Sequence, residues 1–158
     1  MIISLVLSAL VAQATQAPIQ PFLGVTPPSG YTEVSPPGDP TSRLWGKGDG
    51  ENAEIIVLNV SHGTNRSTQS YVTDVYIPDF NKVSEEYHVA SSRAVTVCGG
   101  PGWEIREEFV FQDRPTVQLS LFRATHDYII EAHYQHSQSR EEDPSAVAAI
   151  RKLCPAKK

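Results

Sequence analysis

Apolar and polar residues alternate over much of the stretch from residue 86 to residue 134, which is the pattern of β-strands in a sheet with one buried face. A two-residue turn at residues 125–126 would pair Leu121 with Ile130 in an antiparallel hairpin. That register keeps the apolar side chains of both strands on one face, so the pattern predicts a half-buried antiparallel sheet. The strands that it predicts cover residues 94–98, 103–111, 117–121 and 128–134.

An almost continuous apolar run, EIIVLNV at residues 54–60, precedes this region. Such a run is typical of a central strand that is covered on both faces. Residues 30–34 and 43–48 are shorter strand candidates, and the first of them is expected at an edge. Phe122 and Ile129 point away from the apolar set of their own strands, which indicates that the second face of the sheet is partly covered as well.

Two segments have the features of helices. Residues 67–77 repeat apolar residues at helical spacing, Ser67 suits the N-cap, and Pro78 is expected to end or bend this helix. The second helix begins at Asp143, a good N-cap that is followed by a proline, and ends before Pro155. Strands and helices together predict an α+β domain.

The N-terminus differs in composition from the rest of the chain. Residues 1–20 carry no charged side chain, and residues 2–11 form an apolar run that is too short for a bilayer, which needs about 20 apolar residues. Small residues form an A-x-A cleavage site that ends at Ala14, and a second candidate ends at Ala17. The pattern predicts a signal peptide over residues 1–17, and a buried N-terminal strand or helix is the alternative.

Prolines gather directly after this segment. Seven of the 12 prolines lie within residues 18–40, a density that excludes a helix and predicts an extended entry segment at residues 18–30. The remaining residues, 31–155, have the length of a single domain.

The charge of the chain excludes several partners. The 158 residues include 13 Lys and Arg against 18 Asp and Glu, a net charge of −5, and no basic cluster is present. Binding to nucleic acid or to an anionic lipid surface is therefore not expected. With the signal peptide removed, we expect a secreted or periplasmic monomer without a transmembrane anchor, and no motif requires a cofactor.

The two cysteines, Cys98 and Cys154, allow one intrachain pairing in an oxidising compartment. Cys98 ends a predicted strand and Cys154 lies on the apolar side of the last helix, so a helix laid over the sheet would bring them together. Reduced core thiols and a reactive Cys98 are the alternatives. The reactive cysteine lacks a recognisable catalytic signature, although five histidines are available as a base: His62, His88, His126, His133 and His136.

A metal site is conceivable where His133 and His136 lie close to Glu141 and Glu142. Positions three apart on a strand point to opposite faces, so the two rings could share an ion only if the strand ended near Tyr134. Solvated polar residues at a strand end are the favoured interpretation, and we assign no metal ligand.

Glu107 interrupts the apolar face of its predicted strand. It is either an acid–base group or one half of a structural ion pair, for which Arg123 is the expected partner, and the structural role is favoured. Glycosylation sequons begin at Asn59 and Asn65, but a position within a predicted strand makes Asn59 poorly accessible. We assign no catalytic and no cofactor-binding residue.

Two motifs resemble one family. TVCGGPGW, residues 96–103, is similar to the "LCG…PAW" turn of small exported bacterial proteins with a PsbP/Mog-like fold, although Gly102 stands where the family pattern has alanine. DPSAVAAIRKLCP, residues 143–155, resembles their closing "A…AI…LCP" helix. Over about residues 25–155, the resemblance implies an antiparallel sheet packed with two main helices as an α/β/α sandwich, with Cys98 bonded to Cys154.

A function does not transfer with this fold, because proteins that share it differ in activity. We expect a non-catalytic exported domain that binds a protein partner or an envelope component. A small-ligand carrier with a pocket between sheet and helix is the first alternative, and a hydrolase or metalloenzyme is the second. An apolar cavity of about 300 Å³ or more would favour the carrier.

Overall fold

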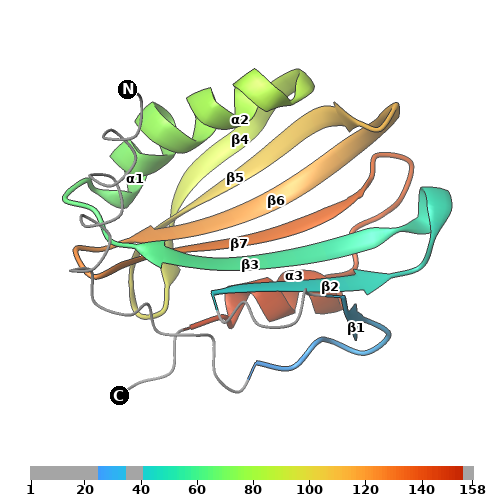
Figure 1. Cartoon of the computed structure of the whole chain (residues 1–158), viewed down its shortest axis with the longest axis horizontal. Coiled ribbons are helices and arrows are strands. Elements are labelled where there is room, and N and C mark those ends of the chain that lie inside the picture. Colours follow the sequence, from blue (N-terminus) through green and yellow to red (C-terminus); the bar gives the residue numbers. More distant parts are fainter. Residues whose placement is uncertain (1–24, 35–40, 155–158) are drawn as a thin grey trace, which may run out of the picture.

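The computed structural model describes residues 25–34 and 41–154 (Figure 1). Seven antiparallel strands form one sheet in the order β1-β2-β3-β7-β6-β5-β4. One helical segment packs on one face of the sheet and the C-terminal helix packs on the other. The predicted α+β sandwich is therefore confirmed.

The elements follow one another in two groups along the chain. The strands are β1 (Thr32–Glu33), β2 (Ser42–Lys47), β3 (Glu54–His62), β4 (Glu85–Val97), β5 (Gly100–Phe111), β6 (Arg114–Ala124) and β7 (Tyr128–Ser137). The helical elements are η1 (Gly50–Asn52), α1 (Thr68–Tyr71), η2 (Val72–Tyr76), α2 (Ile77–Val83) and α3 (Pro144–Arg151). Within the described residues, none of these helices has the length and apolar character that crossing a membrane requires.

Pro78 does not end the first helix. Ser67 caps α1 as predicted, because its hydroxyl accepts the N–H of Ser70 at 3.1 Å. The turn η2 is π-helical, with the N–H of Ile77 donating to the carbonyl of Val72, and the helix continues to Val83. Proline has no N–H and its ring clashes with the carbonyl four residues earlier, so the wider turn accommodates Pro78 without ending the helix.

The register of the β6–β7 hairpin differs from the prediction. The turn lies one residue later, at His126 and Asp127, and Leu121 pairs with Ala132 and not with Ile130. A slip of two residues leaves every side chain on the same face. The predicted register is therefore wrong, while the predicted assignment of side chains to faces is correct.

The strand β3 is central, between β2 and β7, as the apolar run predicts. It is nevertheless buried on one face only. Ile56 and Leu58 are fully buried, whereas Ile55 and Val57 on the other face are half-buried. The prediction that β3 is covered on both faces is thus wrong.

The turn after β4 is shorter than the run of glycines suggests. Cys98 and Gly99 both have positive φ, 53° and 74°, and β5 begins at Gly100. Gly102 lies within β5, where a Cβ would come 2.9 Å from the carbonyl oxygen of Phe122 and closer still to the side chain of Val97. This close approach explains why glycine stands where the family pattern has alanine.

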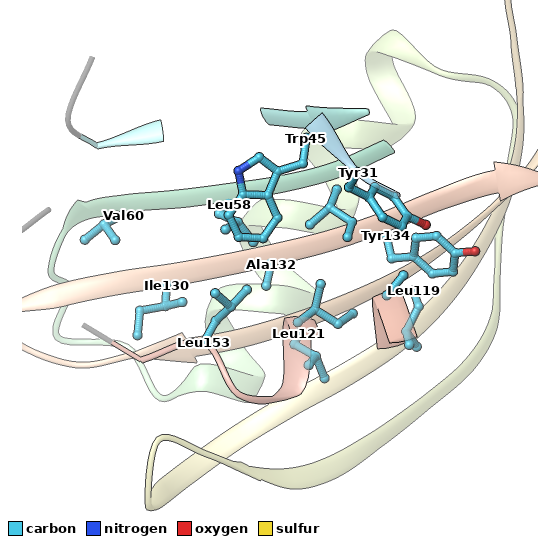
Figure 2. Close-up of a cluster of buried hydrophobic side chains, with 13 residues drawn as sticks. Tyr31, Trp45, Leu58, Val60, Leu119, Leu121, Ile130, Ala132, Tyr134 and Leu153 are labelled. Carbon is cyan, nitrogen blue, oxygen red and sulfur yellow. The ribbon is translucent and has the colours of Figure 1, made fainter. Parts of the chain in front are cut away.

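The main hydrophobic core lies between the sheet and α3 (Figure 2). Asp143 caps this helix by accepting the N–H of Ser145 at 2.8 Å, and Ala146 and Ile150 face the sheet. The core consists of 13 buried residues: Tyr31, Trp45, Ile56, Leu58, Val60, Leu119, Leu121, Ile130, Ala132, Tyr134, Ala146, Ile150 and Leu153.

Candidate functional site

The opposite face of the sheet, under the helical segment α1–η2–α2, has polar side chains at its centre. Four of them are almost fully buried: Glu107 on β5, Gln118 and Ser120 on β6, and His133 on β7. The strand register places Glu107 opposite Gln118 and Ser120 opposite His133. We call these four residues the buried polar cluster, and Tyr76 of η2 lies against it.

Glu107 is the innermost group of the cluster and is fully buried. Its Oε2 accepts hydrogen bonds from Ser120 Oγ at 2.5 Å and from Gln118 Nε2 at 2.7 Å. Its Oε1 accepts the hydroxyl of Tyr87 at 2.8 Å, and Tyr76 adds a longer contact of 3.3 Å. A buried carboxylate requires such donors, because burial without hydrogen bonds is costly.

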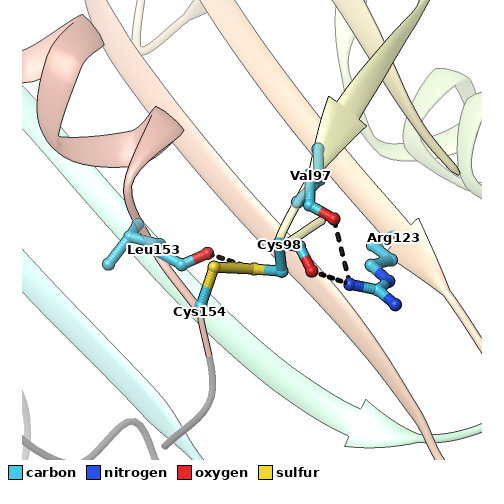
Figure 3. The surroundings of a disulfide bond; sticks show 5 residues. All are labelled: Val97, Cys98, Arg123, Leu153 and Cys154. Carbon is cyan, nitrogen blue, oxygen red and sulfur yellow. Dashed lines mark hydrogen bonds between the residues drawn. A yellow bond between two sulfur atoms is a disulfide. The ribbon is translucent and has the colours of Figure 1, made fainter. Parts of the chain in front are cut away.

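The predicted ion pair between Glu107 and Arg123 is wrong. Arg123 points to the α3 face of the sheet, where its guanidinium donates to the backbone carbonyls of Val97 and Cys98 (Figure 3). Within the described part of the chain, no Lys or Arg forms an ion pair with Glu107. Its hydrogen-bond donors are the neutral side chains of two tyrosines, a glutamine and a serine.

His133 connects the cluster to the surface. Its Nδ1 lies 2.9 Å from Ser120 Oγ, and its Nε2 lies 3.8 Å from Glu131 Oε2. The ring stacks on Tyr76 with centroids 5.7 Å apart. A row of polar side chains, through Ser120 and His133, thus extends from the fully buried Glu107 to Glu131, whose side chain is 17% exposed.

Glu131 is charged at neutral pH. Burial raises the pKa of its carboxyl, but hydrogen bonds, above all from His133, outweigh burial and hold the pKa below its usual range. Tyr71 donates its hydroxyl to the same carboxylate. The pKa of Tyr76 is raised, first by burial and then by the negative charge of Glu107, so this tyrosine remains a neutral donor.

The cluster combines a serine, a histidine and carboxylates, but it offers a substrate no access. A catalytic serine needs an exposed Oγ with a base that takes its proton and donors for the developing oxyanion. Ser120 is 0% exposed and donates to Glu107. The geometry therefore gives no support to a hydrolase. Among the residues that the structure describes, no group of three or more His, Cys, Asp or Glu side chains is placed to hold a metal ion.

Next to the cluster, no helix within residues 25–34 and 41–154 covers the sheet. The segment α1–η2–α2 packs on β4, β5 and β6. The strands β3 and β2 lie toward the opposite edge of the sheet (Figure 1). The register places Leu44 opposite Val57 and Val57 opposite His133 on this face. Val34, which is 54% exposed, continues the row beyond Leu44. We call the apolar row of Val34, Leu44, Ile55 and Val57, with Glu131 and His133 at its border, the open face.

Two of the hollows at the surface are relevant to ligand binding. One of about 120 Å³ lies at the end of the open face, between Ile55, Gln135 and the 49% exposed Phe111. A larger open groove of about 580 Å³ lies between residues 25–28 and α3, with Trp45 in its lining. The first is smaller than the pocket that a carrier requires, and the second is open and has a mixed polar and apolar lining.

The histidines of the conceivable metal site do not converge. His133 lies on the helix-covered face, whereas His136 stacks on Tyr134 on the α3 face. The two rings thus point to opposite faces of β7, as the alternation predicts. Glu142 forms an ion pair with Arg106 at 2.5 Å.

The remaining candidate residues lie apart from the cluster. The ring of His126 is exposed and contacts Asn65 at 3.0 Å. Asn59 lies half-buried within β3, on the open side of the sheet. The proposed cleavage sites at Ala14 and Ala17 lie outside the described residues.

A disulfide joins Cys98 to Cys154, with Cα atoms 5.3 Å apart (Figure 3). It connects the turn after β4 with the residues that follow α3. The predicted disulfide is therefore present, and neither cysteine is a free thiol in the structure.

Sequence reasoning missed most of the polar cluster. Gln118 and Ser120 alternate with the leucines of β6, so they match the pattern of the solvent-exposed side of a half-buried strand. Phe122, two residues after Ser120 on the same face, was the signal that this face is covered. The tyrosines that close the cluster, Tyr76 and Tyr87, gave no sequence signal of this role.

Comparison with known proteins identifies the fold. No protein-family model and no curated protein matches the chain. Among solved structures, a protein of unknown function from Pseudomonas aeruginosa is similar with a TM-score of 0.63 and 9% identity, over 82% of this chain and 100% of that chain. The Ran-binding protein Mog1p of Saccharomyces cerevisiae follows with a TM-score of 0.56 and 11% identity, over 82% and 83% of the two chains.

LpqN of Mycobacterium tuberculosis, a protein involved in cell envelope biogenesis, has a TM-score of 0.55 and 11% identity, over 82% of this chain and 78% of that chain. Together these neighbours show that the chain has a PsbP/Mog-like fold, as the two sequence motifs imply. At such low identity the likeness extends to the fold alone.

Proposed function

We propose that the chain is an exported, non-catalytic binding domain that docks a protein partner of the cell envelope on its open face. The observation that carries this proposal is the apolar row on β2 and β3, which no helix of the described structure covers. An uncovered apolar row beside a polar border is typical of an interaction surface. The serine of the adjacent cluster is buried, so chemistry at this place has no support.

The border of the open face defines the chemistry of the partner. Glu131 is charged and partly exposed opposite Asn59, two residues before His133, which faces Val57, and the chain as a whole carries a net charge of −5. A matching surface presents apolar side chains flanked by Lys or Arg, whose aliphatic stem covers the apolar row while its charge meets Glu131.

Two further observations support the proposal. The predicted signal peptide and the disulfide between Cys98 and Cys154 both suit an oxidising compartment outside the cytoplasm. Among the structural neighbours, Mog1p is a Ran-binding protein and LpqN is involved in cell envelope biogenesis. Binding is thus an activity that this fold supports.

Site-specific photo-cross-linking in the native host tests the proposal. A benzoylphenylalanine at Val34, an exposed position in the row, is expected to give a discrete protein adduct, and the same probe at the exposed Ala148 on α3 is the control. Val57→Asp and Glu131→Lys are expected to remove the adduct without unfolding the domain. An adduct that survives Val57→Asp, or that forms equally from Ala148, would contradict docking on the open face.

A small-ligand carrier is the second candidate, and one observation favours it. The indole N–H of Trp45 is buried without a hydrogen-bond partner, and Trp45 lines the groove of about 580 Å³ beside α3. An apolar ligand with a hydrogen-bond acceptor would fit that groove. Native mass spectrometry of protein isolated from its host is expected to show a bound small molecule if the carrier function holds, and a bare polypeptide mass if it does not.

A further inference from the structure

The outer edge of the sheet at β4 is a second exposed feature. A terminal strand leaves backbone N–H and C=O groups without a strand partner, and proteins protect such edges with charges, bulges or short strands. At the opposite edge, β1 has only two residues. The strand β4 has 13 residues, and no other strand of the described structure pairs with its outer side.

The two halves of β4 differ in this protection. Between residues 85 and 91 the pairing with β5 shifts register twice, and Glu86 has a positive φ of 51°. Residues 91–97, in contrast, pair with β5 in unbroken register. Their exposed side chains are small apart from Arg93, which pairs with Glu104 at 2.5 Å, a carboxylate that Arg151 also contacts at 3.1 Å. This half of the edge is regular and Arg93 is its one charged side chain.

We infer that two copies of the chain pair through this half of β4, antiparallel about a two-fold axis at Ala94. This register places Ser92 opposite Thr96 of the second copy, a pair of hydroxyl side chains that is favourable between strands. It places Arg93 opposite Val95, so like charges do not face each other. The contact is isologous and closed, as a two-fold dimer requires.

A second copy fits this edge because its strand ends in the right place. In the register about Ala94, the turn of the second copy at Cys98 and Gly99 lies opposite residues 89–90, where the bulged half of β4 begins. The regular stretches therefore cover each other fully, and the bulges of each copy lie beyond the end of its partner's strand. The interface is small, so we expect a concentration-dependent dimer and not an obligate one.

Analytical ultracentrifugation over a range of protein concentrations tests the inference. The parent protein is expected to dimerise as its concentration rises. Ala94→Lys places two lysines opposite each other at the axis and is expected to weaken the dimer at least about tenfold. Ala148→Lys, at an exposed alanine of α3 away from this edge, is the matched control and is expected to leave the dimer intact. A parent that stays monomeric at every concentration, or equal effects of the two lysines, would overturn the inference.

Cysteine cross-linking gives an independent test. Opposed residues of antiparallel strands have Cα atoms about 4.5–5.5 Å apart, which suits a disulfide. Ala94→Cys is therefore expected to form an intermolecular disulfide on oxidation, and Ala148→Cys, at an exposed alanine of α3, is expected not to. Equal cross-linking of both variants would contradict the register.

The variant Val57→Asp separates this inference from the proposed function. It is expected to abolish partner docking on the open face and to leave the dimer intact. If Val57→Asp dissolves the dimer, the two copies meet on the open face and pairing through β4 is wrong.

Discussion

The two faces of the sheet are packed by different means. The α3 face is covered by a core of 13 buried, mainly apolar residues, of which Tyr31 and Tyr134 donate their hydroxyls to the buried Glu54, and a disulfide fixes its helix to the sheet. The other face has a smaller set of buried apolar residues, among them Val72, Ile105 and Phe122, and a hydrogen-bonded polar cluster occupies its centre. The first face gains stability from area removed from water, and the second depends on the correct geometry of each bond.

This difference also explains where the sheet remains open. Apolar packing is non-directional, so α3 packs on the middle of the sheet and contacts side chains from several strands. The polar cluster holds the helical segment over β5 and β6 through fixed partners, and the segment does not extend over β3. The face that depends on hydrogen bonds is consequently the one on which the described helices leave the apolar row of β2 and β3 uncovered.

The largest expected effect is the loss of the disulfide on the α3 face. Cys98→Ser or Cys154→Ser is expected to lower the free energy of unfolding by about 4 kcal/mol, because the bond closes a long loop in the unfolded chain, with the two cysteines 56 positions apart. The double variant is expected to cost little more than either single one. Urea denaturation measures all three, and additive effects would show that each cysteine stabilises the domain separately.

Neighbouring residues of β3 compare the two faces directly. Leu58→Ala, on the α3 face, is expected to cost about 3 kcal/mol, because its side chain is fully buried. Val57→Ala, on the open face, is expected to cost less than about 1 kcal/mol, because its side chain is only half-buried. The same denaturation experiment compares both variants, and a similar cost for the two would mean that the open face is covered.

The polar cluster is expected to respond to the loss of a single hydroxyl. Ser120→Ala removes a donor to Glu107 and the partner of His133, so we expect a cost of about 1–3 kcal/mol. Ser61→Ala, at an exposed position of β3, is the control and is expected to change stability by less than about 0.5 kcal/mol. If Ser120→Ala is as neutral as its control, the cluster contributes nothing to the packing of this face.

The smallest expected effect concerns the stability of the domain at acidic pH. Burial raises the pKa of the Asp143 carboxyl, but hydrogen bonds from Lys47 and Ser145 outweigh it and leave the pKa well below its usual range. A carboxyl with a depressed pKa in the folded state stabilises it above the unfolded value of about 4 and loses this contribution as the pH falls further. Asp143→Asn is therefore expected to lower stability at pH 7 and to reduce the loss of stability between pH 4 and pH 2. An unchanged acid profile would show that other carboxyls dominate it.

The period-two pattern predicted the strands and their faces, because alternation is a local property of the chain. Burial on the helix-covered face was not predictable in the same way. The polar residues of β6 match the pattern of a solvent-exposed strand face, and only the position of the helical segment shows that Ser120 is buried while Val57 is not. The path of the helix past Pro78 likewise depends on a π-turn that propensity does not specify.

The candidate site was predictable in part. Glu107 was recognised because a carboxylate interrupts an apolar alternation, which is a local signal. Its partners were not recognised, because they come from three other elements that only the register of the sheet brings together. The ion pair with Arg123 was the natural expectation from charge, but the two residues lie on opposite faces of the sheet.

The closed loop between Cys98 and Cys154 has a mechanical consequence. It contains β5, β6, β7 and α3, whereas β1, β2, β3, the helical segment and β4 lie outside it. A force applied to the two ends of the chain would therefore extend only the part outside the loop, and the bond would withhold roughly 190 Å of contour length, at about 3.4 Å for each of the 56 residues. Under such a force, the strands outside the loop would thus separate from the sheet in the oxidised chain, while β5, β6 and β7 would stay within the loop that the disulfide closes.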